Sequence, residues 1–201
     1  MFDFVPKVTR TLIFINVIVF FLQTILTSAL PIEWFALWPA SVPPGYVGYP
    51  RFEPWQVITY AFLHGGVNHL FLNMLGLYMF GSDVERVFGE KRFLQIYFSS
   101  VITAALFQMI FYSLMGGEPS PTIGASGGVF GLLLTYALCF PKRTVMLLIP
   151  PIPMPAWLFA TLYGAIELFQ GIAGTQSGVA HFAHLGGMLG AWLFLKYWRR
   201  R

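Results

Sequence analysis

Two side chains that together could perform nucleophilic catalysis stand among small residues. Ser126 lies in a Gly-Ala-Ser-Gly-Gly run, and His184 lies in an Ala-His-Leu-Gly-Gly run. A serine hydroxyl becomes an effective nucleophile when a neighbouring base takes its proton, and imidazole can be that base. Taken alone, a serine among glycines in an apolar segment more often packs or bonds between helices. The chemistry therefore depends on whether the fold brings Ser126 and His184 together.

The chain around these residues is too apolar for a water-soluble domain. Of its 201 residues, 57% are hydrophobic and 10% are charged, against about 45–50% and about 25% in soluble domains. A bilayer span needs about 20 apolar residues, and the charge-free stretches predict six transmembrane helices. Their expected ranges are 11–31, 66–82, 93–115, 122–140, 155–172 and 178–197. We therefore expect an all-α integral membrane protein with a single domain, 1–201.

The basic residues predict the orientation of these spans. With the amino end inside, eleven of the twelve Lys and Arg fall in cytoplasmic segments, and only Arg51 falls outside; this is the bias of the positive-inside rule. Both termini are therefore expected in the cytoplasm. The Pro-rich segment 31–50 becomes a long first outer loop, and its Trp and Tyr residues favour a position in the membrane interface. Because the basic residues are dispersed around the spans, nucleic acid is not an expected partner.

Polar residues of three spans are expected in one shallow layer near the outer surface. The Gly65-Gly66 pair predicts that the second span begins near Gly66, so His69 and Asn73 lie four residues apart on one helix face. Ser126 and His184 lie at a similar depth in the fourth and sixth spans. All four side chains therefore point to one site.

Small residues four apart predict a close approach of the fourth and sixth spans. The pairs are Gly124 with Gly128, Gly127 with Gly131, Gly186 with Gly190, and Gly187 with Ala191. Close packing of these two helices would bring the Ser126 hydroxyl within hydrogen-bond reach of His184.

In combination, these motifs resemble those of the rhomboid intramembrane serine proteases. The Gly-x-Ser-Gly nucleophile motif of that family matches Gly124 to Gly127, and its Ala-His-x-x-Gly motif matches Ala183 to Gly187. The His-x-x-x-Asn motif of its second span matches His69 to Asn73. The resemblance extends over essentially the whole chain, including the six spans and the long first outer loop.

The resemblance implies a role for each of these residues. Ser126 would be the nucleophile and His184 the general base, in a dyad without an acidic third member. The oxyanion would be held by the side chains of His69 and Asn73 and by the backbone amide of Ser126, with Gly124 beside them. Phe130 stands where some members have a tyrosine that stacks on the catalytic histidine. No metal and no cofactor are expected.

Four other residues leave alternatives open. His181 competes with His184 for the role of base, although the family spacing favours His184. Glu167 is the one charge deep in a span; it is an interhelical contact, a gate or substrate contact, or a participant in the chemistry. His64 is interpreted as a residue that orders the loop. Gln56 replaces an arginine that follows a tryptophan in many members. A metal site among the histidines is disfavoured, because no His-Glu-x-x-His spacing and no carboxylate companion is apparent.

The sequence thus predicts a serine endopeptidase that cleaves transmembrane segments of other membrane proteins near their outer end. A bacterial cytoplasmic membrane is the expected location, and the lipid bilayer and a transmembrane protein substrate are the expected partners. The oligomeric state is not predicted. The alternatives are a catalytically inactive rhomboid-like protein that binds transmembrane clients, and a small transporter or proton relay. The transporter is disfavoured because the polar residues cluster near the outer ends of the spans.

Overall fold

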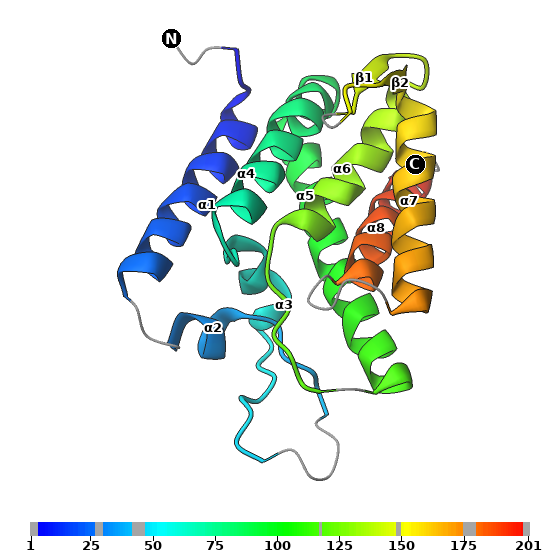
Figure 1. Cartoon of the computed structure of the whole chain (residues 1–201). Helices are drawn as coiled ribbons and strands as arrows, with labels where there is room; N and C mark the ends of the chain where they lie inside the picture. The colour runs from blue at the N-terminus through cyan, green and yellow to red at the C-terminus, as the bar shows by residue number, and fades with distance from the viewer. Residues whose placement is uncertain are drawn as a thin grey trace.

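The computed structural model describes residues 4–26, 30–41, 47–116, 118–147, 150–174 and 180–198, and the chain in these ranges is mostly helical (Figure 1). The helices are α1 (Lys7–Ile25), α2 (Leu30–Phe35), α3 (Gln56–Thr59), η1 (Tyr60–Phe62), α4 (Val67–Gly76), η2 (Leu77–Gly81), α5 (Ser82–Met115), α6 (Ser126–Cys139), α7 (Ala156–Ala173) and α8 (His181–Trp198). The strands β1 (Thr144–Met146) and β2 (Pro153–Pro155) pair antiparallel.

Helices α5, α6 and α8 pack most extensively on one another and form the centre of the bundle. In Figure 1, α1 covers one side of this centre and α7 the other. The amino end and the β1–β2 hairpin lie at the upper end of the view, and α2 and α3 lie at the lower end. The contact between α6 and α8 therefore lies within the bundle.

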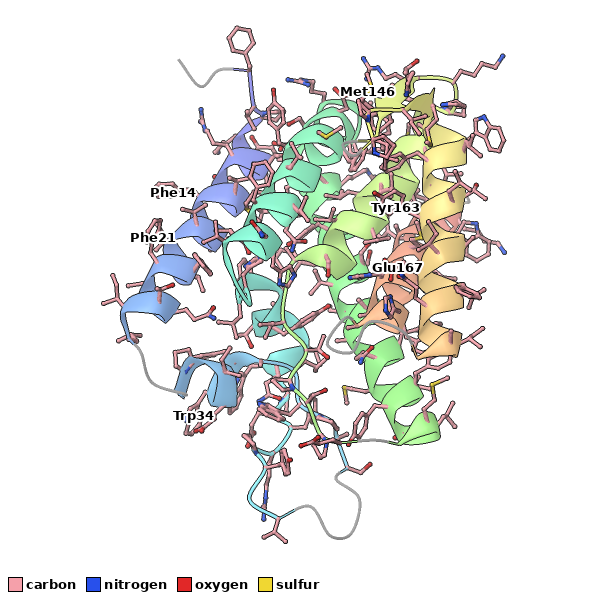
Figure 2. The ribbon with its side chains drawn as sticks, in the orientation of Figure 1. Phe14, Phe21, Trp34, Met146, Tyr163 and Glu167 are labelled. Atoms are coloured by element: carbon pink, nitrogen blue, oxygen red, sulfur yellow. The ribbon has the colours of Figure 1, made fainter. Side chains whose placement is uncertain are left out.

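The distribution of polarity is inverted relative to a soluble protein. On α1, Thr9 and Asn16 are fully buried, whereas Phe14 and Phe21 are 64% and 60% exposed and point away from the bundle (Figure 2). Among the residues that the structure describes, three helical segments are long and apolar enough to cross a membrane: Lys7–Ile25, Val67–Met115 and Ala156–Ala173. These features are typical of a membrane protein; six crossings, a single domain and the orientation stay predictions.

The second and third predicted spans are separated by a kink at Gly89, within the charged stretch 83–92 that we expected as a loop. The chain is helical on both sides of Gly89, whose φ of 73° and ψ of 166° are not helical. The break therefore falls in the charged stretch, although the residues around it are helical rather than extended. The Glu85 carboxylate uses this position to accept the backbone N–H groups of Val8 (2.9 Å) and Thr9 (2.7 Å), which have no partner within the first turn of α1.

Helix α6 begins at Ser126, four residues later than expected. Gly124 has φ 123°, a conformation that other residues rarely adopt, so the chain before Ser126 is not helical. Figure 1 shows this segment rising in extended form from the lower end of α5 to the start of α6. Thr122 exchanges two backbone hydrogen bonds with Leu37, of 2.9 and 3.0 Å, which tie the segment to the first loop. Ser126 is therefore placed partway into the bundle.

The described part of the first loop, which extends from the end of α1 to the start of α4, contains three short helical elements, α2, α3 and η1, that the sequence analysis did not predict. Gln56 holds this loop together from a fully buried position. Its Oε1 accepts the Trp38 backbone N–H (3.2 Å), and its Nε2 donates to the carbonyls of Trp34 and Arg51, both at 3.4 Å. An uncharged amide thus supplies three hydrogen bonds to the loop at this position.

The predicted close approach of the two glycine-rich helices is present. A methyl group on Gly187 of α8 would overlap the carbonyl oxygen of Gly127 of α6 and lie 3.1 Å from its Cα. Gly186 and Gly190 face α5 instead, where a methyl group would lie 2.9 and 2.7 Å from the backbone carbonyls of Thr103 and Ser99. The backbones of α6 and α8 are therefore in direct contact.

We expect Gly187→Ala to lower the stability by about 1 to 3 kcal/mol, because the added methyl overpacks this contact. Gly164→Ala is the matched control, since its methyl would meet Met188 Sδ at an ordinary 3.5 Å. Alanine is also favoured over glycine in a helix by roughly 0.5 to 1 kcal/mol. Thermal unfolding in detergent should show a lower midpoint for Gly187→Ala only; equal midpoints for the two variants would contradict the proposed packing constraint.

Candidate functional site

A serine hydroxyl and an imidazole meet where α6 and α8 begin. Ser126 Oγ lies 2.8 Å from His184 Nε2, although the two residues are 58 positions apart in the sequence. Ser126 is the first residue of α6, and His184 lies in the first turn of α8. This is the geometry that a base needs to take a proton from a nucleophile.

His69 turns its second ring nitrogen toward the same point. The backbone N–H of Gly65 donates to His69 Nδ1 at 3.3 Å, so neutral His69 carries its proton on Nε2. A methyl group on Gly124 would lie 2.7 Å from this Nε2 and 3.7 Å from Ser126 Oγ. The Nε2–H group and the hydroxyl therefore border the space above Gly124, where an oxyanion could be held.

Two further donors lie near this space. The Asn73 side chain is buried and lines the same cavity as Ser126. One of its amide hydrogens is donated to the His69 carbonyl at 3.0 Å, which leaves the second amide hydrogen for another acceptor. The Ser126 backbone N–H is at the first position of α6, where no intrahelical acceptor exists.

The imidazole of His184 is held flat against Phe130. The two rings stack with their centroids 4.3 Å apart and an angle of 4° between their planes. The Phe130 ring also contacts Tyr163 of α7, with 6.3 Å between the two ring centroids. This stack restricts the rotation of the His184 ring.

His64 lies beside the site without contacting Ser126. Its backbone is held by Gln23, whose Nε2 donates to the His64 carbonyl (2.9 Å) and whose Oε1 accepts the His64 N–H (3.2 Å). Its ring meets the His69 ring edge-on at 5.1 Å. Burial, followed by the neighbouring His69, lowers the pKa of His64 to about 4, so it is neutral at physiological pH.

Glu167 reaches His184 from the opposite side of the ring. Its Oε2 lies 2.7 Å from His181 Nδ1 and 2.9 Å from His184 Nδ1. The contact with His181 has hydrogen-bond geometry, whereas the oxygen lies off the direction in which His184 Nδ1 would donate. The expectation that the histidines lack a carboxylate companion is therefore wrong; adjacent turns of α7 and α8 supply one that sequence spacing does not reveal.

These three groups could also hold a metal ion, because one ligand atom from each lies within 4.8 Å of the others. Imidazole nitrogen and carboxylate oxygen are ligands of zinc. The hydrogen bond between His181 and Glu167 satisfies one atom of each of these two groups without an ion.

A cavity of about 610 Å³ opens beside these residues, lined mainly by α4, α6 and α7. Its wall includes polar residues that the sequence analysis did not single out, among them Gln108 and Tyr163. Gln108 had a visible signal, since it is a polar side chain within an apolar span. Tyr163 had none, because tyrosine is common in membrane helices near the interface.

Comparisons with known proteins identify the family of the chain. A protein-family model described as Rhomboid domain matches residues 51–201. Rhomboid protein 1, mitochondrial, of Saccharomyces cerevisiae is 33% identical over 67% of this chain and 39% of its own length. The putative rhomboid protease YdcA of Bacillus subtilis is 30% identical over 82% of this chain and 77% of its own length. Rhomboid protease AarA of Providencia stuartii is 28% identical over 94% of this chain and 72% of its own length.

The chain thus spans about two fifths of the yeast mitochondrial relative and most of the two bacterial ones. The resemblance seen in the motifs is confirmed by a match to more than half of the chain. This protein belongs to the rhomboid family.

Proposed function

We propose that the protein is an intramembrane serine endopeptidase with Ser126 as nucleophile and His184 as general base. The Ser126 hydroxyl attacks a peptide carbonyl while His184 Nε2 takes its proton, and His184 returns that proton to the leaving amine. Water then hydrolyses the acyl-enzyme by the same steps in reverse. The observation that carries the proposal is the 2.8 Å contact between Ser126 Oγ and His184 Nε2.

The negative charge on the tetrahedral intermediate is stabilised by three donors in this proposal. They are the His69 Nε2–H, the free amide hydrogen of Asn73 and the backbone N–H of Ser126. Preorganised donors of this kind stabilise the charge as it develops, because they need no reorganisation during the reaction.

The proposed substrate is a transmembrane segment of another protein, cleaved near its outer end. Ser126 lies inside the bundle, at the cavity whose walls are α4, α6 and α7. A helix in a membrane satisfies its own backbone hydrogen bonds, so the segment has to unwind locally before a carbonyl can reach Ser126. Such unwinding favours substrates with helix-destabilising residues near the cleaved bond.

We place the protein in a bacterial cytoplasmic membrane, with both termini in the cytoplasm. Support comes from the basic residues, which gather at the predicted inner ends of the spans.

Labelling with a fluorophosphonate in detergent tests the nucleophile and the base. We expect Ser126→Ala to abolish labelling and His184→Ala to reduce it at least 100-fold, since the hydroxyl is weakly nucleophilic without its base. Ser120→Ala is the matched control, because Ser120 lines the same cavity and has no assigned role; it should be labelled like the wild type. A folded wild type that stays unlabelled would refute the proposal and favour the client-binding alternative.

Gly124→Ala tests the oxyanion site. Its methyl would lie 2.7 Å from His69 Nε2 and would force a residue other than glycine to adopt φ 123°. Loss of one oxyanion donor typically costs about 100- to 1000-fold in rate, and we expect a fall of that size in the cleavage of a transmembrane model substrate. Gly66→Ala is the control, because its methyl would meet no atom within 4 Å. Equal rates for the two variants would place the oxyanion elsewhere.

A further inference from the structure

A buried carboxylate that the proposed mechanism does not use lies against its base. Glu167 is 8% exposed and comes from about the middle of α7, as Figure 2 shows. Its Oε2 is 2.9 Å from His184 Nδ1, the ring nitrogen that faces away from Ser126. Ser126, His184 and Glu167 therefore lie in sequence, with the imidazole between hydroxyl and carboxylate.

The protonation state that His184 needs as a base determines which group in this contact donates a hydrogen bond and which accepts it. To accept a proton from Ser126, His184 Nε2 must be bare, so neutral His184 carries its hydrogen on Nδ1. Among the described residues this buried Nδ1 makes no hydrogen bond, and Glu167 Oε2 is within 3 Å of it. A small rotation of the carboxylate would align the oxygen with this N–H group and satisfy it.

His181 explains why the carboxylate is turned slightly away. Its Nδ1 is hydrogen-bonded to the same Oε2 at 2.7 Å, and it stands three residues before His184 on α8. Two imidazoles thus share one carboxylate oxygen. When His184 takes the Ser126 proton it becomes positive, and its attraction for the buried carboxylate then increases in a surrounding of low dielectric constant.

We propose that Glu167 is the acidic third member of the catalytic group. Its carboxylate orients the His184 ring through Nδ1–H and balances the positive charge that His184 gains, while His181 holds the carboxylate in reach. Glu167 stays ionised throughout and takes no proton. It acts through His184 and is therefore a positioning residue; the inference rests on the proposed peptidase activity of Ser126 and His184.

The test measures the rate of fluorophosphonate acylation as a function of pH, normalised to the folded fraction. We expect Glu167→Gln to lower the plateau rate about 10- to 100-fold, the effect of losing a hydrogen bond to a charged group. It should also move the midpoint of the acidic limb to lower pH, because protonated His184 loses its counter-charge. His69, Tyr163 and His181 also face this site and are unchanged in the variant.

Conservative replacement separates charge from packing. Glu167→Asp keeps the carboxylate on a shorter stem, so its plateau rate should fall between those of the wild type and Glu167→Gln. Glu85→Gln is the matched control, because it neutralises another buried carboxylate. The Glu85 carboxylate accepts hydrogen bonds from Val8 and Thr9 of α1. That variant should lose stability and keep the wild-type pH profile.

A variant that keeps the charge covers the case in which Glu167→Gln does not fold. In His181→Gln the amide can still donate a hydrogen bond to the carboxylate, which therefore remains beside His184, so the acidic midpoint should not move to lower pH. The inference is overturned if Glu167→Gln matches the wild type in rate and midpoint, if Glu167→Asp is no faster than Glu167→Gln, or if His181→Gln shifts the midpoint downward. A wild type that is not labelled would instead refute the peptidase function itself.

Discussion

The direct contact between the backbones of α6 and α8 is the constraint on which the rest of the site depends. It occurs at Gly127 and Gly187, each one to three residues from a proposed catalytic side chain. Because no side chain separates the two helices there, the Ser126 hydroxyl and the His184 ring can approach each other directly. Each helix presents its residue in its first turn, and therefore the hydroxyl and the imidazole meet at the same level of the bundle.

The other elements act on this pair from three directions. From α4, His69 borders the space above Gly124, and Asn73 lines the same cavity. From α6 itself, Phe130 lies flat on the imidazole, and from α7, Glu167 reaches the far nitrogen of the same ring. Outside this polar interior the helices expose large apolar side chains such as Phe14, Phe21 and Phe169. Exposed apolar groups favour contact with lipid. The positions of the side chains inside the bundle are therefore fixed largely by polar contacts.

Local signals in the sequence predicted the elements that depend on local chemistry. The Gly65-Gly66 break precedes a helix that begins at Val67, and the glycine spacing indicated the contact of α6 with α8. What could not be predicted depends on rotation and register in three dimensions. Nothing in the apolar stretch around Glu167 shows which side of α7 faces His184. The pairing of Thr144–Met146 with Pro153–Pro155 joins two short segments that carry no strand pattern. The buried position of Gln56 depends on carbonyls of Trp34 and Arg51 that only the folded loop brings together.

The length of α6 connects this geometry to hydrolysis. Fourteen residues extend about 21 Å at 1.5 Å per residue, which is less than the roughly 30 Å of a hydrocarbon core. A helix of this length that reaches one surface must begin below the other. The extended segment before Ser126 fills the remaining depth, tied by Thr122 to Leu37, and it leaves the cavity of about 610 Å³ beside it. Irregular backbone at membrane depth is tolerated where it is buried in protein or lines a water-filled space. The same short helix that buries Ser126, the proposed nucleophile, therefore also leaves the space through which water and a substrate carbonyl would reach it in the proposed mechanism.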